Sequence, residues 1–122
     1  MLTINATQMT VLARDSMQRF VLDMCRHLKV HFPEESSSLG PFDLAIAVAN
    51  GIQKARGYGL ESRRDLCSFL NLCAFFGWDF DTRPEYAWMR QTLTDSRLPT
   101  PSARLHLLNA ECLYRLEMAA AG

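Results

Sequence analysis

The chain has 122 residues, 48% of them hydrophobic and 21% charged, which fits one globular domain over residues 1–122 and excludes wholesale disorder. Thirteen basic residues balance thirteen acidic ones, so the basic excess of a protein held to nucleic acid by phosphate contacts is missing. No run of about 18 apolar residues occurs, and the N-terminus lacks the pattern of a secretory signal. We therefore expect a cytoplasmic protein whose partners include neither nucleic acid nor a membrane.

A long amphipathic helix is predicted to begin near Ala6, with Asn5 as its cap, and to end before Pro33. Apolar residues recur in it at steps of three and four, which gives one stripe along about seven turns. The stripe consists of Met9, Leu12, Met17, Phe20, Val21, Met24 and Leu28.

The polar residues 34–40, with three consecutive serines, predict the main loop of the chain. Pro41 then takes a favourable first position in a second helix. Gly57 and Gly59 offer left-handed positions at its end, with Leu60 as the apolar partner of a Schellman-type ending. The core side of this helix is predicted to contain Ala45, Ile46, Ala49 and Ile52, widened by Val48.

A third helix is predicted between a capping Ser62 and a terminating Gly77. Its core face is Leu66, Phe69, Leu70, Cys73 and Phe76. The residues 78–84 predict a turn dense in aromatic and acidic side chains, after which Pro84 can start a short helix that contains Trp88, Met89 and Leu93.

The last helix is predicted to start at a Thr100 cap with Pro101 in first position and to run toward Met118. Its core positions are Leu105, Leu108, Cys112 and Leu116. No alternating strand pattern competes with these segments. We therefore predict an all-α fold, an irregular or orthogonal bundle of about five helices with a long N-terminal helix.

Four cysteines, Cys25, Cys67, Cys73 and Cys112, show neither a Cys-x-x-Cys pair nor zinc-finger spacing. Each lies in an apolar helical pattern, so buried free thiols are predicted.

Two pairs of side chains could carry chemistry. His27 and His31 lie four residues apart, a spacing that can present two imidazoles to one metal ion, but no third ligand is near in the sequence. Asp79 and Asp81 could hold a cation or transfer protons, although aspartates in turns more often accept backbone hydrogen bonds. With no nucleophile elbow either, we expect no enzyme, catalytic residue, metal site or cofactor. A small metal-dependent enzyme is the competing hypothesis.

The aromatic side chains around the turn form the least generic part of the sequence. Trp78, Phe80, Tyr86 and Trp88 could form a core corner where helices meet, or a partner-binding surface, because tryptophan and tyrosine are enriched among interface anchors. Both interpretations can hold for different members of the group.

Several short motifs cover most of the chain. After Gln8-Met9 near the start of the long helix come His31-Phe32-Pro33-Glu34-Glu35, Gly57-Tyr58-Gly59-Leu60, Arg64-Asp65-Leu66-Cys67-Ser68-Phe69-Leu70 and Gly77-Trp78-Asp79-Phe80-Asp81. With these motifs the chain resembles a family of small helical bacterial proteins encoded beside type VI secretion genes for spike-tip proteins, toxic effectors and adaptor chaperones. The serines at 36–38 depart from that pattern, where a more helical sequence is expected.

The resemblance implies a co-chaperone or adaptor that assists loading of a type VI secretion effector by binding its adaptor chaperone or the effector. It supplies no catalytic residues. The same gene neighbourhood permits an immunity protein that neutralises a cognate toxin, and a DNA-binding helical regulator is a further alternative. Whether the chain forms a homo-oligomer is left open.

Overall fold

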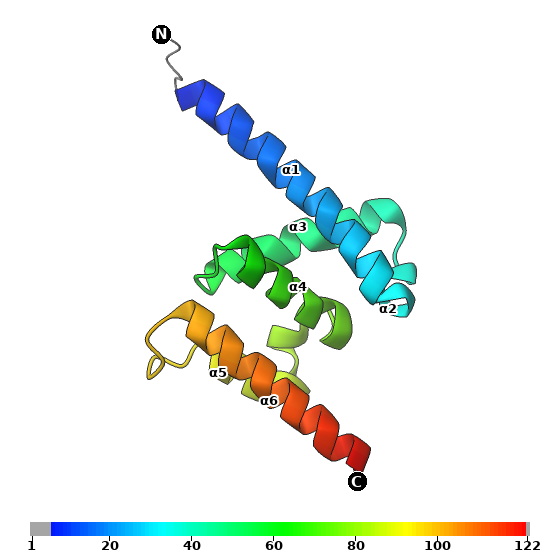
Figure 1. Ribbon diagram of the computed structural model, residues 1–122, viewed down its shortest axis with the longest axis vertical. Helices are drawn as coiled ribbons and strands as arrows, with labels where there is room; N and C mark the ends of the chain where they lie inside the picture. The colour runs from blue at the N-terminus through cyan, green and yellow to red at the C-terminus, as the bar shows by residue number, and fades with distance from the viewer. Residues whose placement is uncertain (1–5, 122) are drawn as a thin grey trace. The chain divides into compact units, whose positions relative to one another are not determined.

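The computed structural model describes the backbone of residues 6–121 and the side chains of residues 16–121. Within this part the chain forms six α-helices and two short 3-10 helices and contains no strand, which confirms the all-α prediction (Figure 1). The elements are α1 (Ala6–His31), α2 (Pro33–Ser37), α3 (Pro41–Gly57), α4 (Arg63–Phe76), η1 (Phe80–Thr82), η2 (Pro84–Tyr86), α5 (Ala87–Leu93) and α6 (Pro101–Ala121).

These elements belong to two compact units, Met1–Asn50 and Gly51–Gly122, and the boundary falls inside α3. The first unit holds α1, α2 and most of α3, and the second holds the rest. The single domain over residues 1–122 stays a prediction.

The described side chains of α1 follow the predicted stripe. Phe20, Met24 and Leu28 are buried, while Met17 and Val21 are half-buried. The predicted cap at residue 5 lies outside the described residues, and the side chains of the stripe members before residue 16 are not described either. The long N-terminal helix as a whole therefore stays a prediction.

The predicted loop over residues 34–40 is wrong in its first half, because Pro33–Ser37 forms α2. Proline in first position and two glutamates in the first turn favour a helix start. Ser36 is buried, and its hydroxyl donates to the Phe32 carbonyl oxygen at 2.7 Å. The serines satisfy carbonyl groups of this short helix, where the sequence pattern indicated only a loop.

The core side of α3 is also partly mispredicted. Val48 and Ile52 are buried as expected, but Ile46 is 45% exposed and Ala49 lies at the surface. Leu44 and Ala55 complete the buried stripe instead. Because apolar residues occur almost all round the first half of α3, the spacing alone permits two different faces.

The end of α3 is a Schellman motif, as predicted. Gly59 has a φ of 89°, its N–H donates to the Arg56 carbonyl at 2.9 Å, and the Leu60 N–H donates to the Ala55 carbonyl at 3.0 Å. Leu60 is buried as the apolar partner. Gly57 remains inside the helix and is not the left-handed residue.

In the second unit the predicted caps of α4 and α6 are confirmed, whereas Pro84 starts the 3-10 helix η2 and the short α-helix α5 begins only at Ala87. The Asp65 N–H donates to the Ser62 hydroxyl at 3.1 Å at the start of α4, and Gly77 ends that helix with a φ of 120°. At the start of α6 the Ala103 N–H donates to the Thr100 hydroxyl at 3.1 Å. These caps satisfy N–H groups that have no partner inside their helices.

The core of the second unit centres on two phenylalanines. Phe69 and Phe80 are fully buried, with ring centroids 5.6 Å apart. Leu105, Leu108 and Cys112 of α6 are buried as predicted, but Leu116 is 43% exposed, so its predicted core position is wrong. In Figure 1 helix α6 lies beside α5 and extends beyond it, which leaves the last turns of α6 without a neighbour in this unit.

No helix in the part of the chain that the structure describes is long and apolar enough to span a membrane.

Candidate interaction surface

The four aromatic residues predicted to bind a partner occupy different surroundings. Phe80 is buried against Phe69 and belongs to the core. Trp78 is half-buried, and its ring would stand 3.2 Å from a Cβ atom added at Gly51, so it packs closely against α3. The core-corner interpretation therefore describes Trp78 and Phe80.

Tyr86 is half-buried and meets the Phe76 ring edge-on, with centroids 5.3 Å apart. The Phe76 ring in turn meets that of Phe75, which is 47% exposed. Tyr86 thus joins a small aromatic cluster between η2 and the end of α4, and its contacts are internal.

The turn after α4 is held by Asp81, a buried carboxylate. Lys54 Nζ pairs with Asp81 Oδ1 at 2.8 Å, the Tyr58 hydroxyl donates to Asp81 Oδ2 at 2.8 Å, and Lys54 Nζ also donates to the Trp78 carbonyl oxygen at 3.0 Å. Burial raises the pKa of Asp81, but the hydrogen bonds from Lys54 and Tyr58 and the Lys54 charge lower it by more, so the pKa of Asp81 lies below its usual value. Burial and the bond to Asp81 raise the pKa of Tyr58. This network fixes the turn to the end of α3.

The second carboxylate of the Asp-x-Asp pair has a different partner. Asp79 is exposed and pairs with Arg83 Nε at 2.8 Å. Each aspartate therefore forms its own ion pair, as expected of turn-stabilising residues.

The second pair predicted as possible metal ligands is His27 and His31 on α1. The His27 and His31 rings contact each other at a tilt of 43°, with centroids 4.4 Å apart. Among the side chains of residues 16–121, no three His, Cys, Asp or Glu groups come together as a set that could hold a metal ion.

None of the four cysteines forms a disulfide. Cys25, Cys73 and Cys112 are buried as predicted, whereas Cys67 is half-buried, so its predicted burial is wrong. Burial raises the pKa of Cys73 to about 12 and that of Cys112 to about 11, which keeps these two thiols protonated at neutral pH.

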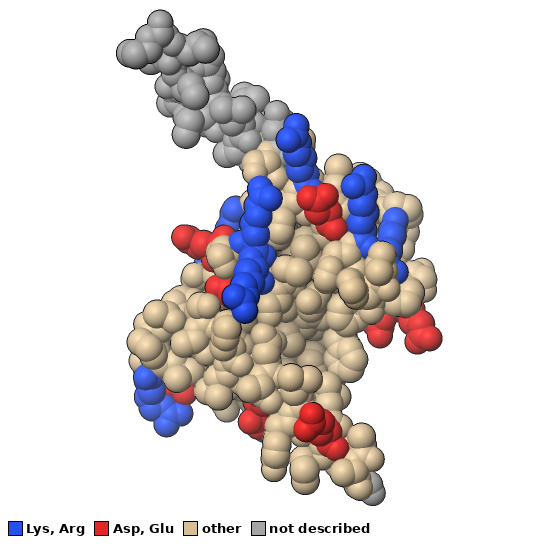
Figure 2. All heavy atoms as spheres, viewed as in Figure 1, with Lys and Arg blue, Asp and Glu red and all other residues tan. Residues whose placement is uncertain are grey.

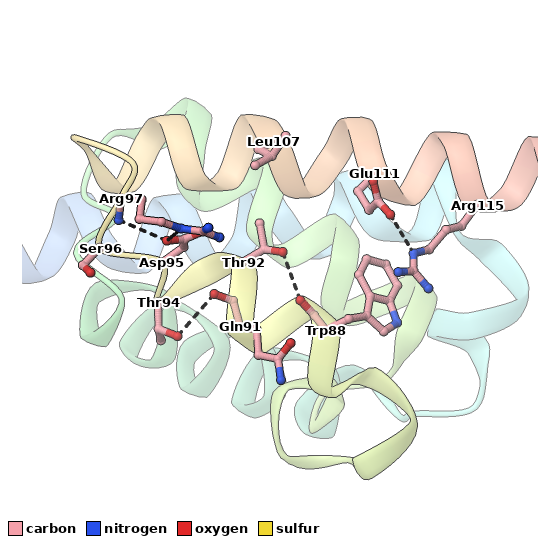
Figure 3. A pocket seen from close by; sticks show the side chains of 10 residues that line it. All are labelled: Trp88, Gln91, Thr92, Thr94, Asp95, Ser96, Arg97, Leu107, Glu111 and Arg115. Atoms are coloured by element: carbon pink, nitrogen blue, oxygen red, sulfur yellow. Dashed lines mark hydrogen bonds and ion pairs between the residues drawn. The ribbon is translucent and has the colours of Figure 1, made fainter.

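Trp88 differs from the other three because it lines a groove of about 520 Å³ between α5 and α6 (Figure 3). We name this the Trp88 groove. The Arg115 guanidinium carbon lies 3.9 Å from the centroid of the Trp88 ring, close enough for a cation–π contact. Arg115 Nε also pairs with Glu111 at 3.0 Å. The indole side chain is thus held between two helices with part of its surface open to the groove.

The loop between α5 and α6 closes one end of the Trp88 groove. Arg97 binds Asp95 with two side-chain hydrogen bonds of 3.0 and 2.8 Å, and these bonds hold the pKa of Asp95 down at about 2. Arg104 Nε donates to the Asp95 carbonyl oxygen at 2.9 Å. Leu107, which is 47% exposed, adds apolar surface to the groove wall.

Sequence reasoning found Trp88 but missed its neighbours on α6. The Glu111 and Arg115 spacing of four residues is a readable signal for a helical ion pair. Nothing in the local sequence indicates that Arg115 meets Trp88, or that Lys54 and Tyr58 meet Asp81, because those contacts join segments more than twenty residues apart.

Comparisons of the chain with protein-family models, curated proteins and solved structures gave no match. The structure itself defines the class as all-α, with a groove that combines an aromatic side chain, an aliphatic side chain and paired charges.

Proposed function

We propose that this chain is a non-enzymatic protein-interaction module that binds another protein through the Trp88 groove. The observation that carries the proposal is the half-buried Trp88 ring, stacked under Arg115 and open to a groove of about 520 Å³. Tryptophan and arginine are the residue types most enriched among those that dominate binding energy at protein interfaces.

The surroundings of Trp88 support the proposal. Its ring stacks with Arg115, which also pairs with Glu111, so the three side chains already contact one another before a partner binds. Leu107 supplies apolar surface, while Gln91 and Thr92 supply polar groups beside it. Protein interfaces commonly combine aromatic anchors with polar and charged side chains.

The resemblance to type VI secretion accessory proteins suggests which partner the module binds. We propose that the chain is a co-chaperone or adaptor, and that its partner is the adaptor chaperone or the effector that the chaperone loads. The immunity-protein alternative uses the same kind of surface against a toxin, so the two are separated by what the partner does.

The test starts from tagged protein purified from its host, with mass spectrometry of whatever accompanies it in stoichiometric amounts. Binding of that partner is then measured for the wild type, Trp88→Ala and Phe75→Ala. Phe75 is the matched control, since it is an exposed aromatic residue that does not line the Trp88 groove. We expect Trp88→Ala to weaken binding by about thirtyfold or more, as for an interface anchor, and Phe75→Ala to leave it unchanged.

Thermal unfolding of the same variants separates binding from folding. If Trp88→Ala lowers stability and affinity together, or if Phe75→Ala weakens binding equally, the Trp88 groove is not the binding surface. A partner that is a secretion chaperone or effector, together with failed effector delivery when the gene is deleted, supports the loading role. Protection of cells from the effector in the absence of any chaperone assigns the immunity role instead.

A further inference from the structure

The outer face of α3 carries apolar side chains that the first unit leaves in solvent. Phe42 is 77% exposed and Ile46 45% exposed, and Ala49 also lies at the surface. These residues are four and three positions apart, so they form one stripe along the helix. A phenylalanine exposed to this degree within such a stripe is the pattern of an interaction site.

This stripe leads to a groove formed with α1. Met17, Gln18, Val21 and Leu22 of α1 and Ala49 of α3 line a space of about 530 Å³, which we name the α1–α3 groove. Its lining is apolar apart from Gln18, and Leu22 is 55% exposed. All of these residues belong to the first unit.

The α1 side of this groove is bordered by positive charge. Arg19, Arg26 and Lys29 are exposed and lie three, four and seven positions from Leu22, which places them on the same side of the helix. Among residues 16–31 the acidic side chain is Asp23, whose contact with Arg26 is 3.9 Å between two exposed groups and therefore weak. Figure 2 shows Lys and Arg side chains following the described part of α1.

We propose that the α1–α3 groove binds an amphipathic helix of a partner protein whose apolar stripe is bordered by aspartate or glutamate. An apolar groove between two helices accepts the side chains at every third and fourth position of a third helix. The basic border selects acidic flanks, since opposite charges steer association and like charges oppose it.

The structure disfavours two other occupants. A second copy related by a twofold axis would bring Arg19, Arg26 and Lys29 against their own counterparts. A membrane surface is flat, whereas the α1–α3 groove is concave and fits a protruding helix better.

The experiment uses the full chain and two synthetic helical peptides of about 18 residues, long enough for stable helix formation in the bound state. Both peptides carry leucines at positions i, i+3, i+4 and i+7. One has glutamates beside the leucines and the other has lysines. Fluorescence anisotropy of each labelled peptide gives its dissociation constant at low and at physiological salt.

Two double variants probe the α1–α3 groove and the apolar stripe that leads to it. The double variant Leu22→Gln/Ile46→Gln removes apolar surface, and Arg19→Glu/Arg26→Glu reverses the border. Leu113→Gln is the matched control, because Leu113 is a 62% exposed leucine of the second unit. All substituted side chains are exposed, so circular dichroism should show the wild-type helix content.

We expect the glutamate peptide to bind the wild type and Leu113→Gln equally and the lysine peptide to bind neither. Charge reversal should weaken binding of the glutamate peptide about tenfold, because each exposed ion pair contributes a factor of a few to the affinity. The same variant should bind the lysine peptide. The double glutamine variant should lose binding of the glutamate peptide.

Three results would overturn the proposal. Equal binding of both peptides would remove the role of the basic border. Sedimentation of the wild type as a dimer that Leu22→Gln/Ile46→Gln converts to a monomer would assign the groove to a second copy. Binding to vesicles of one part phosphatidylserine in three of phosphatidylcholine, lost in the same double variant, would assign it to lipid. None of these results bears on the Trp88 groove, which lies in the other unit.

Discussion

Removal of the Asp81 carboxylate should destabilise the second unit far more than removal of the neighbouring Asp79 carboxylate. Asp81 is buried and accepts bonds of 2.8 Å from both Lys54 and Tyr58, whereas Asp79 is exposed and pairs with the exposed Arg83. The two aspartates are two positions apart, so Asp79→Ala is a close control for Asp81→Ala.

The expected size follows from the groups left behind. In Asp81→Ala the Tyr58 hydroxyl loses a bond to a charged acceptor, which is worth about 1.5 kcal/mol. Lys54, whose side chain is 30% exposed, loses its counter-ion at a cost of about 1 kcal/mol, less than for a fully buried charge. The sum is about 2.5 kcal/mol, against at most about 0.5 kcal/mol for the exposed Asp79 pair.

Urea unfolding followed by circular dichroism at pH 7 measures this difference. With a denaturant slope of about 2 kcal/mol per molar, Asp81→Ala should lower the midpoint by about 1.2 M and Asp79→Ala by no more than about 0.3 M. A double-mutant cycle with Lys54→Met should show coupling of about 1 kcal/mol between residues 54 and 81.

The pH dependence gives a second readout with a fixed sign. The folded-state pKa of Asp81 lies below the unfolded value of about 3.9. The carboxylate therefore stabilises the fold above that pH, and its contribution is lost as the pH falls through the folded-state pKa. The stability difference between wild type and Asp81→Asn should be constant from about pH 5 to 7 and should shrink below about pH 4. Equal effects of the Asp79 and Asp81 substitutions, or a difference that grows in acid, would refute the network.

Two further predictions concern the backbone and the thiols. Gly59→Ala should cost about 1–3 kcal/mol, because φ is 89° and the new Cβ would stand 2.7 Å from Pro101 Cγ, whereas Gly57→Ala, with open space around it, should be neutral or slightly stabilising in the same urea assay. In the native state Cys67 should react with a thiol reagent before Cys73, whose pKa burial raises to about 12; faster modification of Cys73 by mass spectrometry would contradict this order.

Much of the second unit could be predicted because its signals are local. Ser62 and Thr100 cap their helices, and Gly59 and Gly77 take the positive-φ conformations that end α3 and α4. Each of these features is decided within one turn of chain, where residue type and backbone preference coincide. The serines of α2 misled because they satisfy helix carbonyls through their side chains, a choice that composition does not reveal.

The candidate site was predictable only in part because it depends on contacts between distant segments. The aromatic residues stood out in the sequence, but which of them packs inside is decided by Phe69 and Gly51, which close the space around Phe80 and Trp78. Trp88 is left at a groove because the helix opposite it supplies Arg115 in place of an apolar side chain. Local patterns carry neither fact.

The wrong prediction for the core face of α3 shows where this chain has apolar surface to spare for a partner. A helix whose two sides are both apolar can bury one of them in its own unit, and the other then needs a partner or remains a cost to solubility. Leu44 and Val48 take the buried side, which leaves Phe42 and Ile46 outside. Residues 16–31 of α1 present three exposed cations against one acid, and these cations lie beside the groove that α1 forms with α3. The exposed apolar surface and the local basic excess of α1 therefore lie in the same unit, and together they point to a partner with acidic flanks.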